Sequence, residues 1–273
     1  MNVPMRYLTA LTVAGSDSGG CAGIQADLKT FSALGVFGAS VITAVTAQST
    51  VEVRAVEALS PGIVRQQLEA VLDDIPIDAL KTGMLPSPEI VEVVADVIDR
   101  YALKCVVVDP VMASTSGARL APAEVAAALR RLLYRRVSLI TPNIPEAEAL
   151  SGKAIRTEKD FRAAAEALLK QGCPAVLIKG GHLSSAGSVD TLFRQDGEAV
   201  SFSSPRIDTA NLHGTGCTLS AAIAAYRALG QPLEAAIKSA KTYVSSAILS
   251  GSKRTLGKGH GPVDHFFQLG IRN

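Results

Sequence analysis

The stretch His213–Ala222, HGTGCTLSAA, combines a glycine turn, a cysteine and the start of an alanine-rich segment. Gly214 and Gly216 flank Thr215, so successive backbone N–H groups can point at an anion, and the dipole of a following helix adds to the attraction. A thiol at a helix start is expected to have a lowered pKa, which favours the reactive thiolate. Cys217 is therefore a candidate nucleophile or base, with a quiet core residue as the alternative.

Carboxylate and amide side chains follow two apolar runs. Asp109 follows CVVV and precedes Pro110, where its carboxylate can either cap a turn or hold Mg²⁺ through water. Asn143 and Glu146 lie three residues apart at a helix start, where they can form a capping box instead of a binding site. The spacing alone leaves these alternatives open.

A lysine and a second glycine-rich segment complete the candidates. Lys179 ends the run VLIK, and a lysine in a buried strand needs an anionic partner, which a ligand or an internal ion pair can supply. The loop Gly15–Gly23, GSDSGGCAG, allows close approach of backbone to a ligand, or forms a tight turn. Its glycines lack the spacing of a dinucleotide-binding fingerprint, which disfavours a dehydrogenase. The four histidines show no triad or metal spacing, so we interpret them as structural or solvated.

Composition limits the class of protein. The 273 residues carry a formal charge of +2 and are 48% hydrophobic and 19% charged, which predicts one globular α/β domain over 1–273. Its few basic clusters are short and lack interleaved aromatic residues, so neither a nucleic acid nor a membrane is an expected partner. The four cysteines form no C-x-x-C pair, and free thiols favour a cytoplasmic location.

Apolar runs of strand length alternate with amphipathic segments of helix length. The expected strands are 8–14, 36–48, 51–59, 77–84, 104–110, 137–143 and 175–181, with a hairpin over 188–202 that turns at Asp196-Gly197. The expected helices are 21–35, 63–72, 87–100, 122–133, 158–170, 218–229 and one from 232. This alternation predicts a parallel sheet covered on both faces, with ligands beyond the carboxyl ends of its strands, where the polar clusters lie.

Together these motifs resemble one known family. The segments that carry the resemblance are, in order, ALTVAGSDSGGCAGIQADLKTFSALGVFG, KTGML, VVDPVM, LITPNIPEAEAL, VLIKGGH and HGTGCTLSAAIAA. They are similar to the bacterial hydroxymethylpyrimidine/phosphomethylpyrimidine kinases of thiamine biosynthesis, in the ribokinase-like superfamily. The likeness extends from Leu8 to the segment Gly257–Phe267.

The resemblance implies a three-layer αβα sandwich with a mostly parallel central sheet, a homodimer, and ATP and Mg²⁺ as cofactors. One enzyme would phosphorylate the small pyrimidine 4-amino-5-hydroxymethyl-2-methylpyrimidine and then extend its monophosphate to the diphosphate. Sugar kinases of this superfamily carry an aspartate base after the glycine turn, where this family carries a cysteine. By that match Cys217 faces the substrate hydroxyl, and the N–H groups of Gly214–Cys217 form an anion hole for the transferred phosphoryl group.

Further roles follow from the same match. Gln48 corresponds to the residue that hydrogen-bonds the pyrimidine edge, and Gly15 and Met84 correspond to positions around the ring. Asp109 and Glu146 match the Mg²⁺ and phosphate side, whereas Asn143, Lys179 and Lys241 match nucleotide contacts.

The chain departs from the family pattern at several positions. Family lid loops often read VMVAKSGD, whereas this one reads VMASTSGARL, with Thr115 in place of the lysine and Ala118 in place of the acid. Cys21 and Leu212 replace a common glycine and a common threonine. A pyridoxine or pyridoxal kinase is the nearest alternative, although Ser114, Thr115 and Ser116 leave the lid without a second cysteine. A non-catalytic pyrimidine sensor is the alternative from another class.

Overall fold

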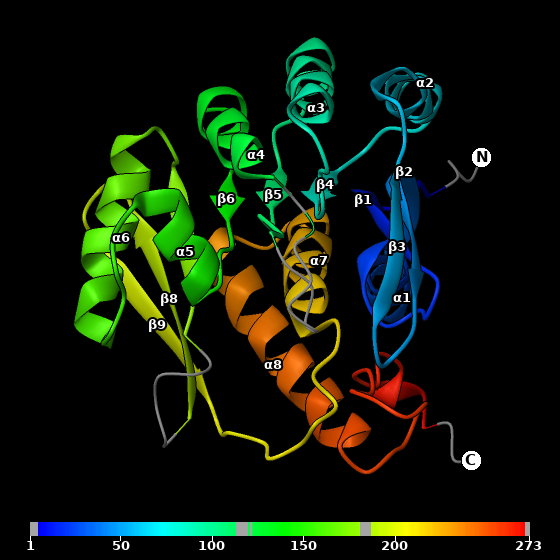
Figure 1. Ribbon diagram of the computed structural model, residues 1–273, viewed down its shortest axis with the longest axis vertical. Helices are drawn as coiled ribbons and strands as arrows, with labels where there is room; N and C mark the ends of the chain where they lie inside the picture. The colour runs from blue at the N-terminus through cyan, green and yellow to red at the C-terminus, as the bar shows by residue number, and fades with distance from the viewer. Residues whose placement is uncertain (1–4, 113–119, 121, 181–186, 271–273) are drawn as a thin grey trace.

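Strands and helices alternate along most of the chain in the computed structural model (Figure 1). The structure describes residues 5–112, 120, 122–180 and 187–270. The strands are β1 (Thr9–Asp17), β2 (Phe37–Gln48), β3 (Val53–Ala58), β4 (Ala79–Thr82), β5 (Val106–Val108), β6 (Leu139–Ile140), β7 (Ala175–Lys179), β8 (Ser188–Arg194) and β9 (Ala199–Ser204). The α-helices are α1 (Gly23–Ala33), α2 (Pro61–Leu72), α3 (Pro88–Arg100), α4 (Ala123–Ala128), α5 (Ile144–Ser151), α6 (Glu158–Lys170), α7 (Thr215–Ala228) and α8 (Leu233–Gly251).

The strands of the described residues form one sheet in the order β3-β2-β1-β4-β5-β6-β7-β8-β9. The six strands from β2 to β7 in this order are parallel, while β3, β8 and β9 add antiparallel edges. The parallel strands are joined by helical crossovers, which return each strand in the same direction. Their carboxyl ends therefore meet along one edge of the sheet.

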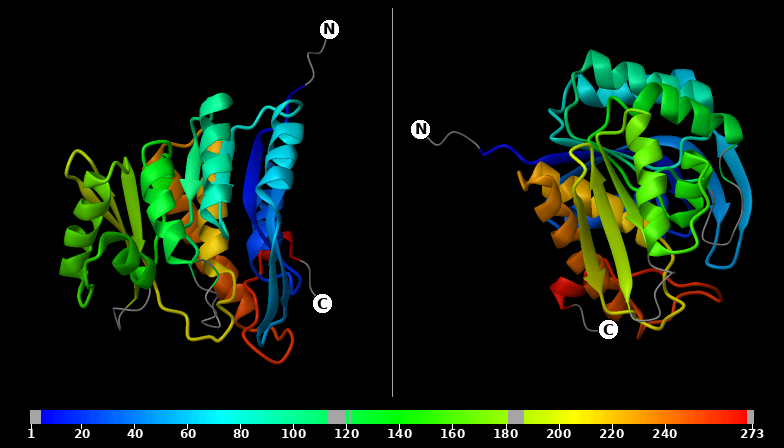
Figure 2. Two further views of the ribbon diagram at one scale, coloured as in Figure 1. Left: turned by 45° about the horizontal axis from the view of Figure 1, so that its top comes forward. Right: turned by 90° about the vertical axis from the view of Figure 1, so that its left-hand side faces the viewer.

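Two hydrophobic cores lie on opposite faces of this sheet. One core includes Leu68 of α2 and Phe161 of α6, and the other includes Phe31 of α1 and Ile223 of α7. Figure 2 shows α2, α3 and α4 on one side of the sheet and α7 and α8 on the other. The predicted three-layer αβα sandwich with a mostly parallel sheet is confirmed.

The C-terminal segment 257–262, here called the C-terminal strap, joins two distant parts of the chain. The His260 N–H donates to the Thr50 carbonyl at 3.1 Å, next to the β2–β3 turn. The His213 N–H donates to the Gly261 carbonyl at 3.2 Å, just before α7. In Figure 1 the red C-terminal segment accordingly lies at the tip of β2 and β3.

Within the described ranges, none of the helices combines the length and apolar character needed to cross a membrane.

Candidate active site

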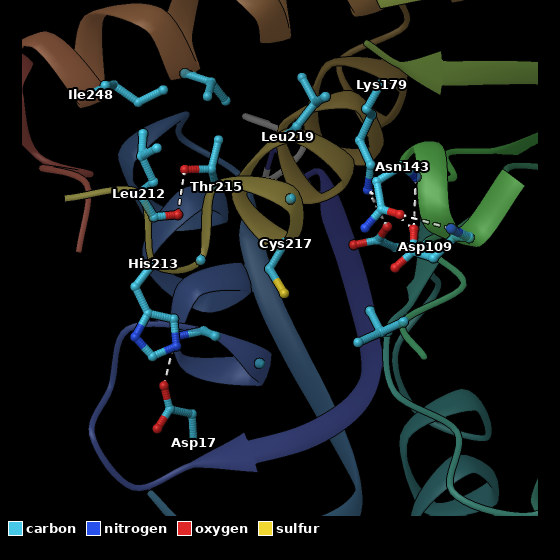
Figure 3. Close-up of a pocket in the computed structure, with 18 of the residues that line it drawn as sticks. Asp17, Asp109, Asn143, Lys179, Leu212, His213, Thr215, Cys217, Leu219 and Ile248 are labelled. Atoms are coloured by element: carbon cyan, nitrogen blue, oxygen red, sulfur yellow. Dashed lines mark hydrogen bonds and ion pairs between the residues drawn. The ribbon is translucent and has the colours of Figure 1, made fainter. Parts of the chain in front are cut away.

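A cavity of about 560 Å³ opens at the carboxyl ends of the parallel strands. It is lined by every residue for which the sequence predicts a role in the site: Gly15, Gln48, Met84, Asp109, Asn143, Glu146, Lys179, Gly214, Thr215, Gly216, Cys217 and Lys241. In Figure 3, His213 lies just before α7 and Cys217 lies in its first turn, opposite Asp109 and Lys179. Residues from both ends of the chain thus converge on one space.

The glycine turn before α7 is held against the first glycine loop. Gly214 is the N-cap of α7 with φ of +81°, and a Cβ there would lie 1.9 Å from the Cys21 carbonyl oxygen. Helix α7 begins at Thr215, three residues earlier than predicted, so Gly216 and Cys217 belong to its first turn. The N–H groups of a first turn lack acceptors inside the helix, which leaves them available to an anion.

The first glycine loop is organised by Asp17 at the end of β1. Its carboxylate accepts backbone N–H groups of Gly19, Cys21 and Ala22 at 2.8, 2.9 and 2.8 Å. Cys21 itself is fully buried. The loop is therefore a built structure that brings backbone to the cavity wall.

Cys217 lies half-buried in the cavity wall, and its thiol is less acidic than predicted. Burial raises the pKa of Cys217 to about 11; Lys81 lowers it, while Asp27 and Asp109 raise it. The predicted lowering of the pKa is wrong because desolvation of a thiolate outweighs the helix dipole and the nearby ammonium group. Cys217 is protonated at neutral pH.

A buried ion pair between β4 and α1 adjoins the thiol. The Lys81 Nζ lies 2.8 Å from the Asp27 Oδ2, both side chains are fully buried, and the Thr12 hydroxyl donates to the same carboxylate oxygen at 2.6 Å. A Cβ on Gly83 would lie 2.9 Å from the Lys81 Nζ, so glycine leaves room for the ammonium group. The sequence reasoning assigned no role to this pair, although a lysine in an apolar strand was the signal that it used for Lys179.

Lys179 and Asp109 form the charged centre of the cavity. The Lys179 Nζ lies 2.7 Å from the Asp109 Oδ1 and 3.9 Å from the Glu146 Oε2. A Cβ on Gly216 would lie 3.4 Å from the same Nζ, so the ammonium group borders the first turn of α7. Burial lowers the pKa of Lys179, but the two carboxylates more than reverse this effect and raise it above its ordinary value.

Asn143 and Glu146 form the capping box that the sequence allowed. The Asn143 Oδ1 accepts the Glu146 N–H at 2.9 Å, and the Glu146 Oε2 accepts the Asn143 N–H at 2.7 Å. Burial raises the pKa of Glu146 to about 7. The cap fixes both side chains at the cavity wall, so capping and a role in the site are compatible.

The donors present fit a Mg²⁺ ion that is shared with phosphate. Within the described residues, no group of three or more His, Cys, Asp or Glu side chains could hold a metal. Mg²⁺ usually keeps several waters and binds one or two carboxylates together with substrate phosphates. Asp109 and Glu146 offer two such carboxylates beside Lys179.

Lys241 is a residue of α8, and it also lines the cavity. Its Nζ lies 2.7 Å from the Asp190 Oδ2 and 2.8 Å from the Ser188 Oγ. Lys241 and the segment 204–209 both line the cavity. The lid residues Ser114, Thr115, Ser116 and Ala118 lie outside the described residues.

Gln48, Gly15 and Met84 occupy the end of the cavity near the first glycine loop. A Cβ on Gly15 would lie 2.5 Å from the Met84 Cε, so these two residues touch. The Gln48 side chain contacts His213, with their Nε2 atoms 3.0 Å apart. Sequence reasoning interpreted His213 as structural or solvated, but it also lines the cavity.

Comparison with known proteins matches this chain to one family. Residues 17–264 match the family described as phosphomethylpyrimidine kinase. The chain belongs to the phosphomethylpyrimidine kinase family. It is 49% identical over 263 residues to a hydroxymethylpyrimidine/phosphomethylpyrimidine kinase of Salmonella typhimurium. The match covers 96% of this chain and 98% of that protein.

Two further known proteins are similar to this chain. The chain is 50% identical over 258 residues to a thiamine biosynthesis bifunctional protein of Geobacter sulfurreducens; the match covers 94% of this chain and spans about half of that protein, 52%. A structure of the pyridoxal kinase from Staphylococcus aureus with AMP-PCP and pyridoxal has a TM-score of 0.88 and 34% identity. It covers 98% of this chain and 96% of that one.

Proposed function

We propose that the protein uses ATP to phosphorylate 4-amino-5-hydroxymethyl-2-methylpyrimidine and then converts the monophosphate to the diphosphate. The observation that carries this proposal is the convergence of Gln48, Cys217 and the Lys179–Asp109 pair on one cavity, in a chain of the phosphomethylpyrimidine kinase family. Gln48 offers the hydrogen bonds that an aminopyrimidine needs, and the other groups offer what phosphoryl transfer needs.

Charge stabilisation is the main contribution of the protein to phosphoryl transfer, since the reaction leaves little covalent work to side chains. Lys179 neutralises negative charge on the transferred group, and the N–H groups at the start of α7 hold its oxygens. Asp109 and Glu146 would hold Mg²⁺, which when bound neutralises phosphate charge. Asn143 and Lys241 contact the nucleotide.

Cys217 contacts the hydroxymethyl group of the substrate. With a pKa of about 11 the thiol is protonated at neutral pH, so it is a weak general base. The proton of a primary alcohol leaves late in a loose transition state, when the oxygen has already become acidic. Cys217 therefore orients the hydroxyl group and takes only a partial share in proton transfer.

The proposal also covers the domain organisation, the oligomeric state and the cellular location of the enzyme. We place a single kinase domain over 1–273, because the described strands join one sheet. We also propose a cytoplasmic homodimer. The four cysteines are free thiols, and the edge formed by β2 and β3 exposes Phe37, Val45 and Val56, which a second copy can cover. Sedimentation equilibrium would detect a monomer if this association is wrong.

Steady-state ADP release with three acceptors tests the function. We expect turnover with hydroxymethylpyrimidine and with its monophosphate, and a lower kcat/KM with pyridoxine under the same conditions. Turnover with pyridoxine or pyridoxal alone would identify the alternative vitamin kinase. Tight binding of the pyrimidine without any ADP release would identify a sensor instead.

A further inference from the structure

The side chain of Asn211, just before the glycine turn of α7, holds three separate pieces of backbone. Its Nδ2 donates to the Gly251 and Arg254 carbonyls at 2.8 and 2.7 Å, and its Oδ1 accepts the Gly261 N–H at 3.1 Å. A carbonyl can only accept and a backbone N–H can only donate, so these three partners fix the orientation of the amide. Asn211 itself does not line the cavity.

The C-terminal strap is bonded on both sides of the peptides that flank Gly261. The Gly261 N–H donates to Asn211, and the Gly261 carbonyl accepts the His213 N–H at 3.2 Å. A Cβ on Gly261 would overlap the Asn211 Oδ1, so glycine allows this close approach. Because His213 directly precedes Gly214, Asn211 acts through the strap on the backbone that enters the glycine turn.

The same strap holds the chain just beyond Gln48. The Gly259 N–H donates to the Thr50 Oγ1 at 3.2 Å, and the His260 N–H donates to the Thr50 carbonyl at 3.1 Å. Thr50 lies two residues after Gln48, the last residue of β2. The strap therefore connects the Gln48 end of the cavity with the start of α7.

Asn211 anchors this connection to the end of a long helix. Gly251 is the last residue of α8, and the carbonyls at a helix C-terminus lack donors inside the helix, so the amide of Asn211 serves them from outside. Helices α7 and α8 share one hydrophobic core. In Figure 1 the end of α8 lies beside the red C-terminal segment. The strap is thus tied to an element that already packs against α7.

We propose that Asn211 is a positioning residue for phosphoryl transfer, which sets the Gln48 end of the cavity relative to the N–H groups at the start of α7. This inference rests on the proposed kinase function and adds to it a residue outside the cavity. The acceptor binds beside Gln48, and its hydroxyl group has to reach the phosphoryl group held at α7. A misplacement of about 1 Å between such groups is enough to slow a reaction ~100-fold.

Asn211→Asp tests this role with almost no change in shape. A carboxylate oxygen then faces the Gly251 and Arg254 carbonyls without a proton to donate, while the bond from the Gly261 N–H can persist. We expect kcat with hydroxymethylpyrimidine to fall about tenfold or more and its KM to rise about threefold or more. Loss of folded enzyme lowers the apparent kcat but leaves KM unchanged, so an unchanged KM would overturn the proposal.

Gln67→Glu is the matched control. The Gln67 Nε2 donates to the Ile42 carbonyl at 3.0 Å and its Oε1 accepts the Ile42 N–H at 2.9 Å, so this amide also ties a side chain to distant backbone. Gln67 lies outside the cavity. The same amide-to-acid change should therefore cost stability in denaturant unfolding but leave KM for the pyrimidine at the wild-type value. A rise in KM equal to that in Asn211→Asp would overturn the proposal.

Thr50→Val tests the strap from its other end and leaves Asn211 in place. It removes the acceptor of the Gly259 N–H, so we expect a smaller rise in the KM of the pyrimidine. In the double variant with Asn211→Asp, the rise should be less than the product of the two separate rises, because both changes break one connection. A rise equal to that product would show that the two residues act independently and would refute the connection.

A second measurement does not depend on turnover. Iodoacetamide labelling of Cys217 in the free protein reports how firmly the glycine turn is held, because a loosened turn exposes the thiol. We expect labelling to be about threefold or more faster in Asn211→Asp and unchanged in Gln67→Glu; an unchanged rate in Asn211→Asp would overturn the positioning role. Failure of the proposed function would show instead as absence of ADP release from the wild-type protein.

Discussion

Single side chains in this cavity take their properties from partners of opposite charge. Lys179 is held by Asp109 at 2.7 Å and Lys81 by Asp27 at 2.8 Å, and all four side chains are largely removed from water. Lys179 is therefore compensated before any ligand arrives, and an incoming phosphate competes with Asp109 for it. We therefore expect this ion pair to exchange when a nucleotide phosphate binds.

Replacement of the thiol tests the residue at the centre of the site. Cys217→Ala is expected to lower kcat about 100-fold, because the hydroxyl group of the substrate loses its contact, while ATP affinity stays near the wild-type value. Cys105→Ala is the control, since Cys105 lies outside the cavity and carries another free thiol. Steady-state kinetics together with calorimetric titration of ATP measures both quantities; an unchanged kcat would refute the role of Cys217.

The Lys81–Asp27 pair should act on Cys217 with opposite signs. Lys81 lowers the pKa of the thiol and Asp27 raises it, so Lys81→Met should slow alkylation of Cys217 and Asp27→Asn should accelerate it. Rates of iodoacetamide labelling near about pH 9, resolved by peptide mass spectrometry, measure the change. The double variant has no unpaired charge and serves as the control for folding. Shifts in the same direction would show that the pair acts only through stability.

The sequence predicts individual site residues only where the local spacing of residue types marks them. Cys217 and Lys179 stand out because each ends a recognisable run, and both line the cavity. The pKa of Cys217 depends on Lys81 and Asp27, whose places in other elements are not visible in the chain near it. His213 was missed as a partner of Gln48 for the same reason, since 165 residues separate the two.

At the scale of elements, the backbone at the start of α7 lies close against the backbone just before α1. Gly214 caps α7 in the left-handed region and faces the Cys21 carbonyl just before α1. This close approach brings the start of α7 against the loop just before α1, on the cavity wall.

An alanine at this junction should be far more harmful than one at an ordinary helix end. Gly214→Ala adds strain at positive φ and a Cβ clash with backbone, so we expect a loss of ~3 kcal/mol or more in the free energy of unfolding. Gly152→Ala is matched, since Gly152 has a φ of +68° but no neighbour within 4 Å, and should cost about 1 kcal/mol. Urea titration compares the two; equal losses would remove the clash from the explanation.

Elements with a clear period were predicted well from the sequence. The helix over 158–170 is confirmed at both ends, and the hairpin of β8 and β9 turns at Asp196-Gly197 as its dipeptide indicates. Helix α7 starts earlier than predicted because Gly214, rather than a polar side chain, supplies the cap. A glycine cap depends on its φ angle, which spacing does not reveal.

The whole molecule should lose stability in mild acid through a buried imidazole. Burial lowers the pKa of His265 to about 4, and the side chain is 4% exposed. As the pH falls below about 6.5 the unfolded chain takes a proton that the folded chain refuses, so stability falls until about pH 4, by ~3 kcal/mol in total.

Denaturant unfolding between about pH 7 and pH 4.5 measures this loss. His265→Gln cannot take up the proton, so its stability should fall less steeply over the same range. Its amide can still bond to the Thr218 hydroxyl, which lies 3.0 Å from the His265 ring. Parallel slopes in the two proteins would assign the acid sensitivity to other groups.

The order of the strands in the sheet could not be predicted from the sequence. Alternating patterns predict a parallel sheet, but they do not say that β1 lies between β2 and β4, because a helical crossover can return on either side of a strand. The edge on which the ligands gather was nevertheless predictable, since every parallel strand ends there whatever the order.

The C-terminal strap has a consequence for the order in which the protein matures during synthesis. Gln48 and Thr50 leave the ribosome early, while His213 and the strap, which bonds to Thr50 through His260, leave much later. Contacts across such sequence separations form late, after the local helices and neighbouring strands. The end of the cavity beside Gln48 is therefore completed only after the strap has been made, which is long after β2 and β3 have left the ribosome.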